Sequence, residues 1–220
     1  FQKNLKYKES DFDFLIGMTN EPILLTVNAH SPYKTLQEMI ATAKAKNLVI
    51  RYSNSGMGGF PQLTVAELSR QAGFKAQPVP FKGSAGAITA ILGGHVDLAV
   101  SHPGEAMPHI QAGKLRPLAI TSSHRFSALS NVPTLKELGY NIDMGVVKFI
   151  FAPKGLPKDV RATLVDALQK AVNDADFKKA IAAIYVMHQP MSGQELQAYF
   201  AAQRPIMKRL IDEMQRSEWK

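Results

Sequence analysis

The sequence predicts an α/β fold built on a parallel-type sheet. Three observations support this: short apolar segments alternate with amphipathic helical patterns, the connections between them are short, and glycine or proline marks many turns. Regular alternation of strand and helix is typical of βαβ units, in which helices cover a largely parallel sheet. The 220 residues suffice for one large domain or two small lobes.

Eight predicted elements alternate through the first part of the chain. Ser31 and Pro32 form a helix start, with serine as the N-cap and proline in the first turn. Between Leu36 and Ala43, apolar residues recur at helical spacing and define one buried face. Gly73 is the expected end of the second helix, because glycine is favoured just beyond a helix C-terminus. The predicted order is helix 31–47, strand 48–52, helix 61–72, strand 74–80, helix 85–92, strand 95–100, helix 103–112 and strand 115–121.

The character of the sequence changes after Ser122. Thr134 and Glu137 form a capping-box pair, which predicts a short helix that stops at Gly139. An apolar strand is expected at 145–151.

Two longer helices are expected near the C-terminus. The buried stripe of the first is predicted to consist of Val160, Leu164, Leu168 and Ala171. Ser192 and Glu195 form a capping box at the start of the second. Pro205 is expected to kink or split this second helix, because its ring removes one backbone hydrogen bond.

Composition excludes several classes of protein. Apolar residues make up 45% and charged residues 20% of the chain, which is a globular balance. No apolar run approaches the ~20 residues that span a bilayer. The chain opens without a signal-peptide pattern, so we expect a mature or trimmed form. The absence of cysteine excludes disulfides, zinc–thiolate sites and thiol nucleophiles.

The net charge of +8 raises the question of a nucleic-acid partner. The lysines and arginines are spread along the chain, mostly on the polar sides of the predicted helices. We therefore interpret them as a solvated basic surface and expect no nucleic-acid partner. A positive field would also attract an anionic solute.

Polar turns between a strand and the following helix are the most informative feature. They lie at 53–59, 81–86 and 101–104. In an open α/β sheet such turns gather at the carboxyl ends of the strands, where ligands bind. Glycines expose backbone N–H groups, serine and asparagine add donors, and a helix start adds partial positive charge, a combination that suits a carboxylate or phosphate. Each turn is also readable as a tight connection without a ligand.

The sequence contains no pattern that indicates catalysis. Ser84 lies in half of a nucleophile elbow, but Lys82 occupies the leading glycine position, and we interpret Ser84 as a helix cap. Asp97 is interpreted as an edge or structural acid. The six histidines are scattered without metal-ligand spacing. We therefore expect no catalytic residue, no metal and no cofactor.

Seven segments together resemble the extracytoplasmic solute receptors of the tripartite tricarboxylate transporter family, also called Bug-type receptors. The resemblance covers essentially the whole chain. The segments are 31–36 (SPYKTL), 52–58 (YSNSGMG), 79–83 (VPFKG), 92–97 (LGGHVD), 113–119 (GKLRPLA), 132–139 (VPTLKELG) and 152–157 (APKGLP).

The resemblance implies a type II periplasmic binding-protein fold, with two α/β lobes and a ligand cleft between them. It implies a non-enzymatic periplasmic receptor, expected to be a monomer, that delivers a small mono- or dicarboxylate to a membrane permease. The effector-binding domain of a transcription regulator is the alternative. The expected ligand-binding residues are Ser53, Ser55, Gly56, Gly58, Gly59, Phe81, Gly83, Ser84, Ser101 and Lys148.

The resemblance also sets the expected lobes. Residues 1–28 plus 122–220 are predicted to form lobe 1, and residues 29–121 lobe 2. Family members begin with a strand, a glycine-rich turn and a helix ahead of the point that matches Phe1, so we expect this part of lobe 1 to be absent. Phe81 stands where the family often has tyrosine. Lys148 either pairs with the distal carboxylate of a diacid or is an ordinary strand-edge lysine.

Overall fold

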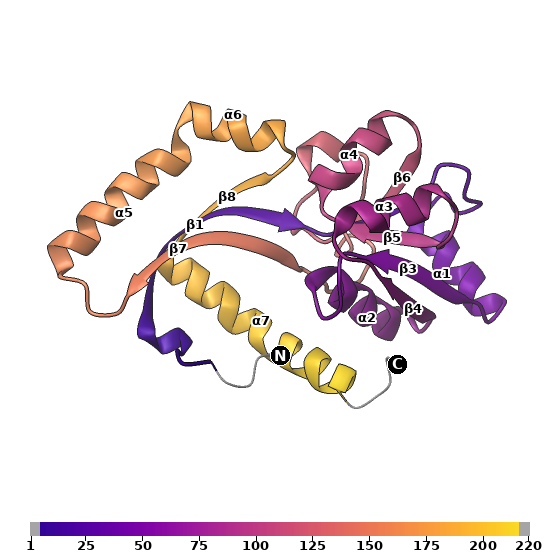
Figure 1. The fold of residues 1–220 in the computed structure, drawn as a ribbon, viewed down its shortest axis with the longest axis horizontal. Helices are drawn as coiled ribbons and strands as arrows, with labels where there is room; N and C mark the ends of the chain where they lie inside the picture. Colours follow the sequence, from indigo (N-terminus) through magenta and orange to yellow (C-terminus); the bar gives the residue numbers. More distant parts are fainter. Residues whose placement is uncertain (1–4, 216–220) are drawn as a thin grey trace. The chain divides into compact units, whose positions relative to one another are not determined.

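Two separate β-sheets organise the chain in the computed structural model, which describes residues 5–215 and their side chains to residue 213 (Figure 1). They belong to two units. Among the described residues, unit 1 contains 5–21 together with Val146–Ile211, and unit 2 contains Pro22–Gly145 together with 212–215. The predicted α/β class is confirmed. None of the described helices is long and apolar enough to span a membrane.

Unit 2 contains a five-stranded sheet with the order β4-β3-β5-β2-β6. Its elements are β2 (Leu24–Asn28), α1 (Leu36–Ala45), β3 (Val49–Asn54), α2 (Phe60–Ala72), β4 (Lys75–Pro80), α3 (Ser84–Leu92), β5 (Leu98–Ser101), α4 (Pro103–Gln111), β6 (Leu115–Ile120) and the 3-10 turn η2 (Ser127–Leu129). These elements follow the predicted order closely.

The sheet of unit 2 is mixed, which corrects the prediction of a parallel-type sheet. β3 pairs in parallel with both β4 and β5. β2 instead runs antiparallel between β5 and β6. An antiparallel strand inserted into a largely parallel sheet is common in α/β folds, and no predicted element covered β2.

The helices of unit 2 lie on both faces of its sheet. The chain moves outward from β3 to β4 through α2 and returns inward from β4 to β5 through α3. Because parallel crossovers are right-handed, these opposite directions place α2 and α3 on opposite faces. Figure 1 shows α3 with α4 on one face and α2 with α1 on the other. The strands between them are buried: Leu24, Leu25 and Leu98 have no exposed surface.

Unit 1 contains a three-stranded sheet with the order β7-β1-β8. Phe14, Val147, Met191 and Leu196 form its core, with Phe149, Tyr199 and Phe200 packed against them. Its elements are η1 (Glu9–Asp11), β1 (Phe12–Pro22), β7 (Gly145–Pro153), α5 (Lys158–Asn173), α6 (Ala175–Ala183), β8 (Met187–Ser192) and α7 (Gly193–Gln215).

Gly193 permits α7 to begin directly against β1. A Cβ atom built at Gly193 would lie 2.1 Å from the carbonyl oxygen of Phe14. The predicted capping box is confirmed: the N–H of Ser192 donates to Glu195 (2.7 Å), and the N–H of Glu195 donates to the Ser192 hydroxyl (3.2 Å). The helix runs through Pro205 as one element, so the expectation of a split is wrong.

The predicted buried stripe of α5 is also wrong. Val160 is 42% exposed and Leu164 is 39% exposed. Leu168 is half-buried and Ala171 exposed. The helix packs on α6, but no described residue covers the face that bears these side chains. Helical spacing identifies an apolar face without identifying what covers it.

Two predicted helix starts differ from the structure. α1 begins after Thr35, whose hydroxyl accepts the N–H of Glu38 at 3.1 Å, so Ser31 is not the cap. At Thr134 and Glu137 the reciprocal capping bonds form, at 2.8 and 3.0 Å. The residues that follow form turns and no α-helix. A capping box closes one turn, and continuation needs further helical hydrogen bonds.

The two units divide the chain at different positions from the predicted lobes, 1–28 plus 122–220 and 29–121. β2 lies between β5 and β6, so its residues belong to the sheet of unit 2. The segment after β6 also stays with unit 2. The N–H of Leu135 donates to the carbonyl of Ile120 at 2.8 Å, and the N–H of Ile120 donates to the carbonyl of Pro133 at 3.1 Å.

Thr121 joins three segments of unit 2, and its replacement tests this connection. Its fully buried hydroxyl accepts the N–H of Ile23 at 2.8 Å and donates to the carbonyl of Met144. Thr121→Val keeps the shape but leaves two buried backbone groups unpaired. We expect the free energy of unfolding to fall by about 2–4 kcal/mol in urea denaturation. Thr163→Val, the same change on the exposed face of α5, is the control and should cost less than about 0.5 kcal/mol. Equal losses in both variants would contradict the structural role of Thr121.

Candidate functional site

The three predicted polar turns lie along one edge of the sheet of unit 2. β3, β4 and β5 are parallel, so their carboxyl ends point the same way. β3 ends at Asn54 and β5 ends at Ser101. The N–H of Phe81 donates to the carbonyl of Asn54 at 3.0 Å, which joins the first turn to the second. The carboxyl edge, defined here by the turns 55–59, 81–83 and residues 101–102, is where an α/β sheet binds ligands.

Two glycines of the first turn have a positive φ. Gly56 has a φ of 145° and Gly58 a φ of 75°, and backbone of this kind favours glycine. The N–H of Gly56 donates to Oδ1 of Asn54 at 3.0 Å. The N–H of Gly58 donates to Oε1 of Gln62 at 2.6 Å. Gly59 is the N-cap of α2 and offers no side-chain cap, so the first N–H groups of that helix lie beside the turn.

Three buried donors at the carboxyl edge have no partner in the described structure. They are Nδ2 of Asn54, Nε2 of Gln62 and the hydroxyl of Ser101. Asn54 and Gln62 have no exposed surface, and Ser101 is 1% exposed. Buried polar groups are normally hydrogen-bonded, so these three donors are exceptions, as is the buried hydroxyl of Tyr52 on β3.

Of these three residues, only Ser101 was among the expected ligand-binding residues. Asn54 lies within the predicted turn, and Gln62 lies in the first turn of α2. The sequence does show one carboxamide residue on each side of the turn 55–59, Asn54 before it and Gln62 after it. This signal is weak, because the burial and orientation of a side-chain amide are not encoded in local spacing.

Ser84 follows β4 and Ser101 ends β5, and Glu105 connects the two. The Ser84 hydroxyl donates to Oε1 of Glu105 at 2.5 Å, and the N–H of His102 donates to Oε2 at 2.7 Å. Gly83, with a φ of 88°, is the N-cap of α3, which corrects the interpretation of Ser84 as a cap. The proton of Ser84 is therefore used within the protein, and its lone pairs remain.

Ser53 and Phe81 contribute to the structure of the edge. The buried hydroxyl of Ser53 donates to the carbonyl of Ala87 at 2.8 Å and anchors α3 to β3. The ring of Phe81 lies against Gly86, where a Cβ atom would be 3.1 Å from the ring. Ser55 is half-exposed in the turn.

Lys148 belongs to unit 1, where it lies on β7. Its Nζ is 3.3 Å from Oε1 of Glu21, and its side chain is 51% exposed. This pair agrees with the interpretation as a strand-edge lysine. In the described part of the chain, no group of three acidic or histidine side chains is placed to hold a metal ion.

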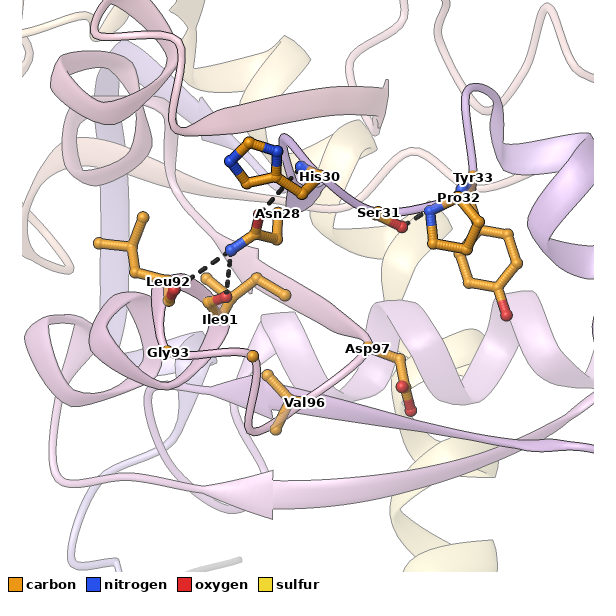
Figure 2. Close-up of a pocket in the computed structure, with 11 residues that line it drawn as sticks. Asn28, His30, Ser31, Pro32, Tyr33, Ile91, Leu92, Gly93, Val96 and Asp97 are labelled. Atoms are coloured by element: carbon orange, nitrogen blue, oxygen red, sulfur yellow. Dashed lines mark hydrogen bonds between the residues drawn. The ribbon is translucent and has the colours of Figure 1, made fainter.

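A cavity of about 480 Å³ lies at the opposite edge of the sheet of unit 2 (Figure 2). Asn28, at the end of β2, lines it together with residues that precede β5. Because β2 is antiparallel to β5, this is the amino edge of the parallel strands. Nδ2 of Asn28 donates to the carbonyls of Ile91 (3.1 Å) and Leu92 (3.2 Å) and closes the end of α3.

Asn28 and Asp97, two polar residues of this cavity, bond within the protein. Oδ2 of Asp97 accepts the N–H of Arg51 at 2.8 Å, which agrees with the interpretation of Asp97 as a structural acid. Burial, and then the neighbouring Asp97, raise the pKa of the Tyr33 phenol, so it stays neutral. We place the candidate site at the carboxyl edge, where the glycine-rich turn and the start of α2 without a side-chain cap lie together.

The comparisons with known proteins agree on one family. A model described as tripartite tricarboxylate transporter family receptor matches residues 1–215. The TctC solute-binding protein from Polaromonas, solved without ligand, is 29% identical with a TM-score of 0.87; the match covers 95% of this chain and 72% of that one. MatC from Rhodopseudomonas palustris, solved with bound malate, is 25% identical with a TM-score of 0.71, over 96% and 72% of the two chains.

The sequence of a curated relative agrees as well. The UPF0065 protein in the gbd 5′ region of Cupriavidus necator is 34% identical over 193 residues, which are 88% of this chain and 58% of that protein. This chain thus spans about half the length of the curated relatives that it matches first.

The positive φ of Gly58 gives a test of the first turn. Gly58→Ala places a Cβ atom in a left-handed conformation that costs about 1–2 kcal/mol. We expect the melting temperature to fall by roughly 2–8 °C for a chain of this size. Gly59→Ala is the matched control, because the φ of Gly59 is −78° and its Cβ would make only ordinary contacts. Circular dichroism melts compare the two variants, and an equal fall in both would contradict the described turn.

Proposed function

Because the chain belongs to the tripartite tricarboxylate transporter receptor family, we propose that it binds a small organic carboxylate at the carboxyl edge of unit 2 and acts as the solute receptor of an uptake system. The single observation that carries this proposal is the glycine-rich turn 55–59 at that edge, which leads into the start of α2 without a side-chain cap. A carboxylate presents only acceptors, so it matches donors that the fold leaves free.

The glycine-rich turn places the start of α2 at this edge. Ser55, Gly56, Gly58 and Gly59 precede α2, whose first N–H groups and partial positive charge favour an anion. Gly83 and Ser84 contribute the start of α3 in the same way. The relative MatC, which was solved with malate, supports a hydroxy-dicarboxylate as one candidate ligand.

The remaining parts of the proposal follow from the family. Its members are solute-binding receptors, which supports a periplasmic location, a membrane permease as partner and a role without catalysis. We propose a monomer that uses neither cofactor nor metal. The net charge of +8 would speed the arrival of an anionic solute. The family assignment favours this reading over the effector-binding domain of a transcription regulator.

A thermal-shift screen tests the proposed function. The panel contains malate, succinate, citrate, glutamate and benzoate, with phosphate, sulfate and neutral sugars as controls. The 220-residue chain and the protein at its full natural length are measured side by side. A ligand at a hundredfold excess over its Kd stabilises the folded state by about 2.7 kcal/mol. We expect a rise of roughly 5–10 °C in melting temperature for a few acids only.

The controls decide how the screen is read. Equal shifts with sulfate and phosphate would indicate general anion binding and would contradict a carboxylate receptor. A flat panel with the protein at its full natural length would refute the assignment.

A further inference from the structure

The cavity of about 480 Å³ at the amino edge of unit 2 lies at the opposite end of the parallel strands from the proposed solute site (Figure 2). Its lining comes from two segments, within residues 28–33 after β2 and within residues 91–97 between α3 and β5. Two segments that carry the family resemblance, 31–36 and 92–97, meet here. The proposed solute site uses neither of them, so the proposed function leaves this cavity without a role.

Hydrogen bonds fix both segments of the lining. Nδ2 of Asn28 donates to the carbonyls of Ile91 and Leu92 at 3.1 and 3.2 Å, which ties one segment to the other. The guanidinium of Arg116 donates to three carbonyls of the loop 29–33, at 2.6, 3.0 and 3.2 Å. The cavity is therefore formed before a ligand arrives, and a preformed site loses little conformational entropy on binding.

The lining combines apolar surface with negative charge. Ile91 and Val96 are apolar and only 1% and 5% exposed. Helix α3 ends at Leu92, and the C-terminus of a helix carries a partial negative charge. Asp97 adds a full negative charge. A ligand that matches this lining has an apolar part and a cationic group.

One carboxylate oxygen of Asp97 is available to such a cation. Oδ2 accepts the N–H of Arg51 at 2.8 Å, whereas no described residue donates a hydrogen bond to Oδ1. The guanidinium of Arg51 approaches with Nε 3.8 Å from Oδ2, but the two side chains are 52% and 37% exposed. An ion pair of this length and exposure contributes little. Neither Arg51 nor Arg116 lines the cavity.

The single available oxygen favours one kind of organic cation. A guanidinium group pairs best through two parallel hydrogen bonds, which need both oxygens of a carboxylate. An ammonium group is a compact charge that is satisfied by one oxygen and by nearby carbonyl groups. The half-buried ring of Tyr33 adds an aromatic surface that attracts a cation.

We propose that the cavity at the amino edge binds a primary ammonium group carried on a methylene stem. The ammonium group contacts Asp97 beside the C-terminus of α3, and the stem packs on Ile91, Val96 and Tyr33. A free alkyl diamine and a lysine side chain of a protein partner share this chemistry. The site is separate from the proposed solute site and takes the opposite charge, so it does not rest on the proposed function.

An NMR titration of the isotope-labelled protein at its full natural length tests the site. The probe is cadaverine, a diamine with a five-carbon stem. We expect saturable shifts of the backbone N–H signals at 28–33 and 91–97, with a Kd on the order of 1 mM. The turn 55–59 should not respond. Pentanol, which has the stem without the charge, and hexanoate, which has the opposite charge, should bind at least ~10-fold more weakly.

Two substitutions should change the affinity for cadaverine in opposite directions. Asp97→Asn keeps an oxygen for the N–H of Arg51 but removes the charge, so the affinity should fall at least ~10-fold. Arg51→Gln removes the competing cation, so the affinity should rise ~2–5-fold. A structural defect would weaken binding in both variants.

Asp166→Asn is the matched control, because it removes an exposed carboxylate on α5 that pairs with Lys170 at 2.7 Å. It should keep the affinity for cadaverine within about twofold of the wild type. Arg51→Gln alone decides the test if Asp97→Asn fails to fold.

A second titration distinguishes the two sources of the ammonium group. Its probes are the acetylated methylamides of lysine and arginine, which present each side chain as it occurs in a protein. Binding of the lysine probe as tightly as cadaverine would identify a lysine of a protein partner as the source. Binding of cadaverine alone would identify a free amine. The arginine probe should bind more weakly than cadaverine in either case, because it needs a second free oxygen.

The absence of saturable shifts at 28–33 and 91–97 would overturn the ammonium site. Unchanged affinity for cadaverine in both Asp97→Asn and Arg51→Gln would overturn it as well. Both results would leave the carboxylate receptor standing, because that proposal concerns the carboxyl edge. A flat panel of acids would in turn leave the ammonium site standing.

Discussion

The parallel pairing of β3 with both β4 and β5 is the constraint on which the candidate site depends. Parallel strands end at the same edge, so three turns that are separated in the sequence lie side by side. The bond from the N–H of Phe81 to the carbonyl of Asn54 continues the β3–β4 pairing past the strand ends. Without this register, Asn54 and Ser101 would not share an edge.

Several polar side chains around this sheet are paired with backbone groups. Arg116 donates to three carbonyls, those of Ala29 (2.6 Å), Ser31 (3.2 Å) and Tyr33 (3.0 Å), and so fixes the loop before α1. Asp97 closes the start of β5 against Arg51. These contacts lie toward the amino edge, where the polar groups support the fold. The amides of Asn54 and Gln62 lie at the carboxyl edge, where the pairing is incomplete.

Unit 1 contains both closely packed aromatic side chains and exposed apolar side chains. Aromatic rings pack against its core, and those of Phe14, Phe149 and Phe200 are in mutual contact. Val160 and Leu164 on α5 remain exposed in the described structure. The contrast illustrates that an apolar pattern reports a tendency to be buried, whereas burial itself depends on what lies opposite.

The sequence by itself determined the α/β class and most element positions of unit 2, because these depend on local periodicity and turn chemistry. The resemblance of seven segments indicated the family. Gly73 ends α2 and Ser192 caps α7 through contacts within a few residues. Tertiary structure alone decided the antiparallel place of β2, since strand order depends on long-range hydrogen bonds. It also decided which polar residues belong to the edge: Ser53 and Ser84 are bonded within the protein. Gln62, which spacing does not distinguish, has no exposed surface in the folded chain.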